Sequence, residues 1–133
     1  MAIDKNMKIL VVDDFSMMRK VIKNILKQLD FHVILEAEHG REALEIIKNN
    51  DDLSLIITDW HMPIMNGLEL LIAIRKNPPT AKLPVLMVTA EALQENILAA
   101  IKAGVSNFVV KPFDANMMKE KIDKIFNNLP SEE

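Results

Sequence analysis

The polar residues best suited to chemistry in this sequence stand directly after short apolar runs. They are three carboxylates, one hydroxyl and one ammonium, at Asp13, Asp14, Asp59, Thr89 and Lys111. If the apolar runs are parallel strands of one sheet, their carboxyl ends share one edge, and ligands bind beyond that edge. Three carboxylates at this edge would repel one another strongly. We therefore expect a divalent cation, together with the Lys111 ammonium, to neutralise them.

The donor atoms of this cluster indicate which metal ion it would hold. Hard oxygen ligands without a His or Cys side chain favour Mg²⁺, with Mn²⁺ as a substitute. Asp13 and Asp14 are predicted to bind the ion or to orient its water, together with Asp59. The backbone carbonyl of His61, two residues after Asp59, is a natural additional ligand.

A Mg²⁺ ion beside a carboxylate, with an ammonium and a hydroxyl nearby, is suited to phosphoryl transfer. Asp59 would be the nucleophile that becomes an acyl phosphate. Lys111 and the Mg²⁺ would hold two phosphoryl oxygens, and Thr89 could donate a hydrogen bond to the third. Each of these residues alone is commonly a turn former, a helix cap or a loop cation. Their joint occurrence at strand ends is what favours a functional site.

Apolar runs rich in β-branched residues alternate with segments of helical periodicity along the chain. The predicted strands are 8–12, 33–35, 55–58, 84–88 and 108–110. Unbroken apolar strands are typical of a parallel sheet covered on both faces, so the pattern predicts an α/β fold. Ser16 and Asp114 are the predicted N-caps of the first and last helices. The other helices are expected near 41–49, 67–76 and 92–103, and Gly104 is expected to end the last of these three.

Length and composition restrict the class of protein. The chain has 133 residues, no Cys and a net charge of −3, without a basic stripe. We expect one domain over 1–133 with flexible tails at 1–6 and 130–133, no thiolate metal site and no binding of nucleic acid. The sequence shows neither a signal peptide nor an apolar run long enough to cross a membrane. We therefore expect a cytoplasmic monomer.

Segments around the candidate residues resemble the CheY-type chemotaxis response regulators, which are single-domain receivers. These segments are 11–16, 59–63, 65–71, 83–92 and 110–113, and the resemblance runs from about residue 5 to residue 129. It implies a flavodoxin-like fold, a five-stranded doubly wound parallel sheet of order 2-1-3-4-5 with helices on both faces. The strand order comes from this resemblance and not from the apolar pattern.

The resemblance also implies a function. A CheA-type histidine kinase would phosphorylate Asp59 in a Mg²⁺-dependent reaction. Thr89 would then move toward the new phosphoryl group, and the aromatic ring of Phe108 would rotate inward behind it. The face built from the fourth helix, the fifth strand and the fifth helix would change and bind the flagellar motor switch protein, and a dedicated phosphatase could remove the phosphoryl group. The bond between Lys111 and Pro112 resembles a cis peptide of the family.

Two residues depart from the best-known chemotaxis receivers. Phe108 stands where those proteins carry Tyr and has no hydroxyl to satisfy, so it should prefer a buried position and bias the switch toward its active state. His61 stands where they carry Asn, and its imidazole lies where water must approach a phosphorylated Asp59. His61 therefore bears on the lifetime of the acyl phosphate. His32 and His39 lack metal-ligand spacing and are expected at the surface.

Other functions share part of this pattern. A flavodoxin-like FMN carrier needs a Ser/Thr/Gly loop after the first strand, but Asp13 and Asp14 occupy that place. A Mg²⁺-dependent phosphatase with an Asp nucleophile needs an acid two residues later, where His61 stands. We therefore expect no enzyme activity beyond self-directed phosphotransfer and autodephosphorylation. A stand-alone receiver that acts as a phosphate sink or phosphorelay intermediate differs only in its partners, and the sequence leaves it open.

Overall fold

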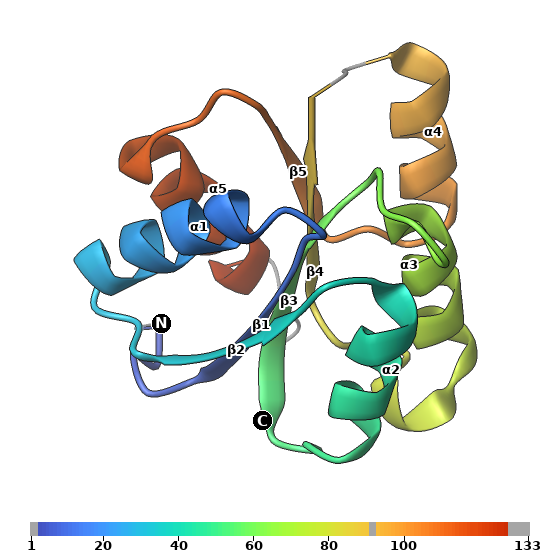
Figure 1. Ribbon diagram of the computed structural model, residues 1–133, viewed down its shortest axis with the longest axis horizontal. Helices are drawn as coiled ribbons and strands as arrows, with labels where there is room; N and C mark the ends of the chain where they lie inside the picture. Colours follow the sequence, from blue (N-terminus) through green and yellow to red (C-terminus); the bar gives the residue numbers. More distant parts are fainter. Residues whose placement is uncertain (1–2, 91–92, 128–133) are drawn as a thin grey trace.

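The computed structural model describes residues 3–90 and 93–127 and shows a parallel sheet between two layers of helices (Figure 1). The strands are β1 (Lys8–Val12), β2 (Val33–Ala37), β3 (Leu53–Asp59), β4 (Val85–Thr89) and β5 (Asn107–Val110). The helices are α1 (Ser16–Gln28), α2 (Gly40–Lys48), α3 (Gly67–Lys76), α4 (Gln94–Lys102) and α5 (Ala115–Asn127), with a short 3₁₀ helix η1 (Pro78–Thr80). The expected tail at 130–133 and the first two residues of the other tail lie outside the described chain.

The sheet has the order β2-β1-β3-β4-β5, and all neighbouring strands are parallel. The expected fold class and strand order are therefore confirmed. The helices α1 and α5 cover one face of the sheet, and α2, α3 and α4 cover the other (Figure 1). No helix in the described ranges is long and apolar enough to span a membrane.

Two apolar cores lie on opposite faces of the sheet and explain the unbroken apolar runs. In β1, Ile9 packs into the core beneath α1 and α5, whereas Leu10 packs into the core beneath α2 and α3. The same alternation continues in β3 and β4. Since both faces of each central strand are buried, polar residues lie at the strand ends or next to them. The chemistry-bearing side chains lie at these ends.

The edge strand β2 continues two residues past its predicted end. Its first four residues are partly or fully exposed, so Glu36 is tolerated there. Glu36 accepts hydrogen bonds from two side chains of α1, Arg19 Nε at 3.0 Å and Lys23 Nζ at 2.9 Å. The bond from Lys23, followed by that from Arg19, holds the pKa of Glu36 below its usual range. Contacts between layers, which apolar periodicity does not reveal, thus stabilise this part of the strand.

The starts of α1 and α5 depend on aspartate side chains. Asp114 caps α5 as expected, because its Oδ1 atom accepts a hydrogen bond from the Met117 N–H at 2.9 Å. The expectation that Ser16 caps α1 is wrong, because the helix already includes Ser16 and Phe15 stands at the cap position without a side-chain bond. The cause is local: Asp13 Oδ1 accepts the Phe15 N–H at 2.9 Å, and this turn starts the helix one residue earlier.

The start of α2 and the two ends of α4 can also be compared with the sequence expectations. His39 caps α2, since its Nδ1 atom accepts the Glu42 N–H at 3.2 Å, a role that the sequence pattern did not suggest. The helix α4 begins at Gln94, and the predicted start at residue 92 lies outside the described chain. Gly104 ends this helix as expected, with a φ of +93° that glycine adopts readily.

Gly67, the first residue of α3, closely approaches the backbone that follows β3. Its N–H donates to the carbonyl of Trp60 at 2.8 Å. A Cβ atom at Gly67 would collide with the carbonyl oxygen of Asp59 and lie 3.0 Å from the Cα atom of Trp60. These are backbone atoms of the last residue of β3 and of the residue that follows it, so they cannot move aside cheaply. Because glycine has no side chain, the start of α3 can pack directly against the backbone at the site.

Gly67→Ala is expected to lower the free energy of unfolding by about 2 kcal/mol, because the added methyl group overpacks against backbone. Gly40→Ala is the matched control, since Gly40 is likewise the first residue of its helix. The atoms nearest to its Cβ would be side-chain atoms of Met65, with Cγ at 2.7 Å and Cβ at 2.9 Å, and not backbone atoms as at Gly67. Urea unfolding of both variants measures the difference, and equal losses for the two would contradict the assigned role of Gly67.

Candidate functional site

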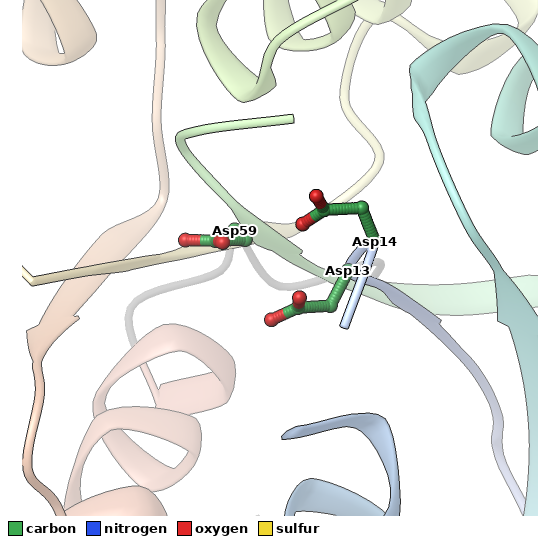
Figure 2. A group of neighbouring side chains, drawn as sticks. All are labelled: Asp13, Asp14 and Asp59. Carbon is green, nitrogen blue, oxygen red and sulfur yellow. The ribbon is translucent and has the colours of Figure 1, made fainter. Parts of the chain in front are cut away.

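The candidate site lies at the carboxyl ends of β1 and β3, where the strand order reverses. The strand β1 has β2 on one side and β3 on the other, which is the usual position of a ligand site in such sheets. Asp13 and Asp14 follow β1, and Asp59 is the last residue of β3. One carboxylate oxygen from each lies within 4.8 Å of the others, and Figure 2 shows the three side chains gathered at this edge. The structure thus brings together the three carboxylates that the sequence singles out.

Asp13 is the most enclosed of the three carboxylates. The residue is 1% exposed, against 8% for Asp59, whereas Asp14 is exposed. One oxygen of Asp13, Oδ1, accepts the Phe15 N–H, but the other, Oδ2, is buried without a hydrogen-bond partner. No other buried side-chain oxygen or nitrogen within residues 3–90 and 93–127 lacks a partner. An oxygen in this state is costly unless a ligand completes its coordination.

Lys111 supplies the positive charge at the site. Its Nζ atom lies 3.5 Å from Asp59 Oδ1 and 3.9 Å from Asp13 Oδ2, so both contacts are ion pairs too long for strong hydrogen bonds. The backbone N–H of Lys111 donates to the carbonyl of Thr89 at 2.8 Å, which ties the end of β5 to the end of β4. The peptide bond between Lys111 and Pro112 is cis, as the resemblance implied.

The cluster has three carboxylates and one ammonium, that of Lys111, and this excess of negative charge fits a divalent cation. Burial raises the pKa of Asp13 above its usual value of 3.8; the hydrogen bond from Phe15 opposes the rise, and the charge of Asp59 adds to it. The donor atoms are all carboxylate oxygens, which hard cations prefer. The buried Oδ2 atom of Asp13 and the group of three carboxylates therefore fit a Mg²⁺ ion.

The predicted switch residues lie on the next two strands. Thr89 ends β4 and is 5% exposed, and Phe108 is the second residue of β5 and is half-buried. With Trp60, Met87 and residues of α4, they line a cavity of about 10 Å³, room for about one water molecule. The Nζ atom of Lys121 lies 5.7 Å from the centre of the Phe108 ring. The two switch residues therefore share one small space beside the site.

His61 follows the site in the loop after β3, and its side chain is exposed. The role of its backbone carbonyl as a metal ligand stays a prediction. His32 is exposed as expected, and His39 is half-buried at its capping position. The loop after β3 also contains Ile64, which is 67% exposed and has a φ of +70°, a strained value for a β-branched residue.

Arg19, in the second turn of α1, was missed by the sequence analysis. Its Nη1 atom donates to the backbone carbonyl of Asp13 at 2.7 Å, and its side chain is 12% exposed. The available signal was a lone arginine soon after an acidic pair at a strand end. This signal is weak, because most arginines at such positions are solvated. The contact depends on how α1 turns back over β1.

The sequence model for the response regulator receiver domain matches residues 9–123 of the chain. The chain belongs to this family. Receiver domains bind Mg²⁺ at an Asp cluster, and here Asp13, Asp14 and Asp59 form such a group. A receiver domain of two-component signalling implies a histidine kinase and a downstream target. The flavodoxin-like FMN carrier considered above is therefore set aside.

Individual relatives point to the same group of proteins. The chain is 50% identical over 127 residues to the chemotaxis protein CheY-3 of Vibrio cholerae, covering 96% of this chain and 97% of the relative. It is 47% identical over 119 residues to a chemotaxis protein CheY homolog of Campylobacter jejuni, covering 90% and 92%. The solved structure of CheY4 of Vibrio cholerae matches with a TM-score of 0.82 at 28% identity, covering 90% and 98%. A receiver domain protein of Clostridium thermocellum matches with a TM-score of 0.81 at 31% identity, covering 91% and 94%. The chain is a CheY-like receiver.

Proposed function

We propose that this receiver is a phosphorylation-activated switch of a chemotaxis pathway, in which Asp59 accepts a phosphoryl group from a CheA-type histidine kinase. The observation that carries the proposal is the carboxylate of Asp59, which lies 3.5 Å from the Lys111 ammonium and within 4.8 Å of two other carboxylates. Support for chemotaxis comes from the two relatives, which are named as chemotaxis proteins. The proposed location is the cytoplasm, and the proposed state is a monomer.

The transfer exchanges one bond to phosphorus for another. An oxygen of Asp59 attacks the phosphorus of a phosphohistidine, an O–P bond forms, the P–N bond breaks, and the histidine nitrogen keeps the electron pair. The Oδ1 atom of Asp59 already accepts the backbone N–H of Trp60 at 2.8 Å and faces Lys111. We therefore assign the attack to Oδ2. Lys111 is close enough to contact a phosphoryl oxygen as negative charge develops there.

The carboxylates of Asp13, Asp14 and Asp59 would hold Mg²⁺, with the backbone carbonyl of His61 as an additional ligand and Mn²⁺ as a substitute ion. When bound, the ion draws negative charge from the phosphoryl oxygens. Thr89 would donate its hydroxyl to a phosphoryl oxygen from the end of β4. We propose no turnover of other substrates, because the carboxylic acid that Asp-nucleophile phosphatases place two residues after the nucleophile is absent, and His61 stands there with an exposed side chain.

Phosphorylation would be communicated through Thr89 and Phe108 to the face formed by α4, β5 and α5. A shift of Thr89 toward the phosphoryl group would enlarge the cavity into which the Phe108 ring can turn. Two apolar side chains of α4 are exposed on the protein, Leu98 at 48% and Ile101 at 56%. Exposed apolar residues of this kind support a docking role, and we propose the flagellar motor switch protein as the partner.

The proposal is tested by the fluorescence of Trp60, the one Trp of the chain, whose backbone N–H donates a hydrogen bond to Asp59 Oδ1. Addition of Mg²⁺ is expected to change the emission, because the ion binds beside this contact. Beryllium fluoride, which mimics an acyl phosphate, is then expected to cause a second change that requires Mg²⁺. A flat response to beryllium fluoride, with folded protein and bound Mg²⁺, would mean that the receiver lacks acceptor chemistry.

The proposed partner needs a separate measurement. The form treated with Mg²⁺ and beryllium fluoride is expected to bind the flagellar motor switch protein more tightly than the untreated form. Equal or absent binding of both forms, with a normal Trp60 response, would favour a phosphate sink or a phosphorelay intermediate. This outcome would leave the role of Asp59 intact and contradict the motor output.

A further inference from the structure

Arg19 links the site to the edge of the sheet through both ends of its guanidinium group. On one side, its Nη1 atom donates to the backbone carbonyl of Asp13 at 2.7 Å. On the other, its Nε atom donates to Glu36 Oε1 at 3.0 Å, and its Nη2 atom lies 4.0 Å from Glu38 Oε1. The side chain is only 12% exposed, so these contacts are formed away from most competing water.

The contact with Arg19 completes the fixation of Asp13. The backbone N–H of Asp13 donates to the carbonyl of Ala37 at 3.1 Å, and its Oδ1 atom accepts the Phe15 N–H at 2.9 Å. The backbone N–H, the backbone carbonyl and one carboxylate oxygen therefore each have a defined partner. The remaining oxygen, Oδ2, is the buried atom without a hydrogen-bond partner. The network thus leaves one oxygen available to a ligand and fixes where it lies.

The charge of Arg19 is balanced within the same network. Glu36 accepts hydrogen bonds from both Arg19 and Lys23, and Glu38 lies near the other end of the guanidinium. A planar guanidinium can donate along two edges at once, which a lysine ammonium cannot do in the same geometry. Because nearby carboxylates compensate its charge, Arg19 can orient Asp13 without strongly repelling a cation at the site.

We propose that Arg19 is a positioning residue for the metal site, which holds Asp13 so that its Oδ2 atom lies ready to bind Mg²⁺. This inference rests on the proposed function, and it adds a residue of α1 and a carboxylate of β2 to the machinery of the site. Groups that orient a ligand without touching the metal commonly change metal affinity by about 10- to 100-fold when they are removed.

The test compares the Mg²⁺ dissociation constants of variants, measured by Trp60 fluorescence without any phosphodonor. Arg19→Gln is expected to weaken Mg²⁺ binding about 10-fold. The change in charge alone predicts tighter Mg²⁺ binding, because the loss of a cation near a metal site favours binding of another cation. Lys23→Gln is the matched control: it removes a cation that pairs with the same Glu36 but does not touch Asp13. We expect it to change the dissociation constant by less than about twofold.

A second variant, Arg19→Lys, separates the effect of position from the effect of charge. It keeps the positive charge but removes the guanidinium, which donates along two edges. It is expected to weaken Mg²⁺ binding by roughly threefold, and it serves alone if Arg19→Gln fails to fold. Unchanged or tighter Mg²⁺ binding in the folded variants, with a normal wild-type response to Mg²⁺ and beryllium fluoride, would overturn the role of Arg19 and leave the proposed function standing. A wild-type protein that does not bind Mg²⁺ would overturn both.

Discussion

Asp59→Asn is expected to abolish phosphorylation by a histidine kinase or by a small acyl phosphate, as measured by the intact mass of the protein. The amide keeps the shape of the side chain and an oxygen that can accept the backbone N–H of Trp60, as Asp59 Oδ1 does at 2.8 Å. It removes the anionic oxygen that must attack phosphorus, and a neutral amide is a poor nucleophile. The variant should therefore fold normally, gain no phosphoryl mass and give no Trp60 response to beryllium fluoride.

The matched control for this result is Asp52→Asn, which changes a carboxylate just before the other end of β3. Asp52 is exposed and pairs with Lys8 at 2.9 Å, remote from the acidic cluster. We expect this variant to take up the phosphoryl group like the wild type. If Asp59→Asn still gained the same mass with the same Mg²⁺ requirement, another residue would be the acceptor, and the assignment of Asp59 would be wrong.

The sequence located the acidic cluster because its residues lie at the ends of buried strands. Each central strand is apolar on both faces, so a polar residue such as Asp59 marks the point where the strand leaves the core. Parallel connections then bring all such points to one edge. The same pattern cannot order the strands, because an apolar run does not show which other run lies beside it. The order β2-β1-β3-β4-β5 was obtained only from the resemblance to known receivers.

The errors arose where a side chain acts on backbone outside its own element. Ser16 has the composition of an N-cap, but the carboxylate of Asp13 takes the Phe15 N–H and shifts the start of α1. Arg19 has no periodicity that marks it, because its partners come from the end of β1 and from β2. Helix and strand patterns describe neighbours within one element, whereas these contacts depend on how the layers pack.

Asp13→Asn is expected to have opposite effects on the stability of the protein without and with Mg²⁺. The buried Asp13 carboxylate has a raised pKa, mainly because of burial, and one of its oxygens lacks a hydrogen-bond partner. An amide at this position carries no charge and can still accept the Phe15 N–H. We therefore expect the variant to gain about 1–2 kcal/mol in free energy of unfolding when Mg²⁺ is removed by chelation, a typical gain for relief of a strained functional site.

The dependence on pH follows from the direction of the pKa shift. A raised pKa means that the folded state keeps its proton to higher pH than the unfolded chain. Between the usual value of 3.8 and the raised folded-state pKa, the stability of the Mg²⁺-free wild type is therefore expected to fall as pH rises, owing to Asp13. Above that window the loss is complete and constant. Asp13→Asn should lack this fall, so the two stability curves should converge at acid pH.

With Mg²⁺ present, the wild type should be more stable than Asp13→Asn. Loss of a carboxylate ligand is expected to weaken Mg²⁺ binding by roughly 100-fold. At a Mg²⁺ concentration 100 times its dissociation constant, the wild type gains about 2.7 kcal/mol, which exceeds the advantage of the variant. Urea unfolding at neutral pH, with chelator or with Mg²⁺, measures both signs, and Asp14→Asn controls for an exposed carboxylate. If Asp13→Asn were less stable than the wild type under chelation, the ionised Asp13 carboxylate would not lower the free energy of unfolding. Its buried Oδ2 atom would then not need a cation as a ligand.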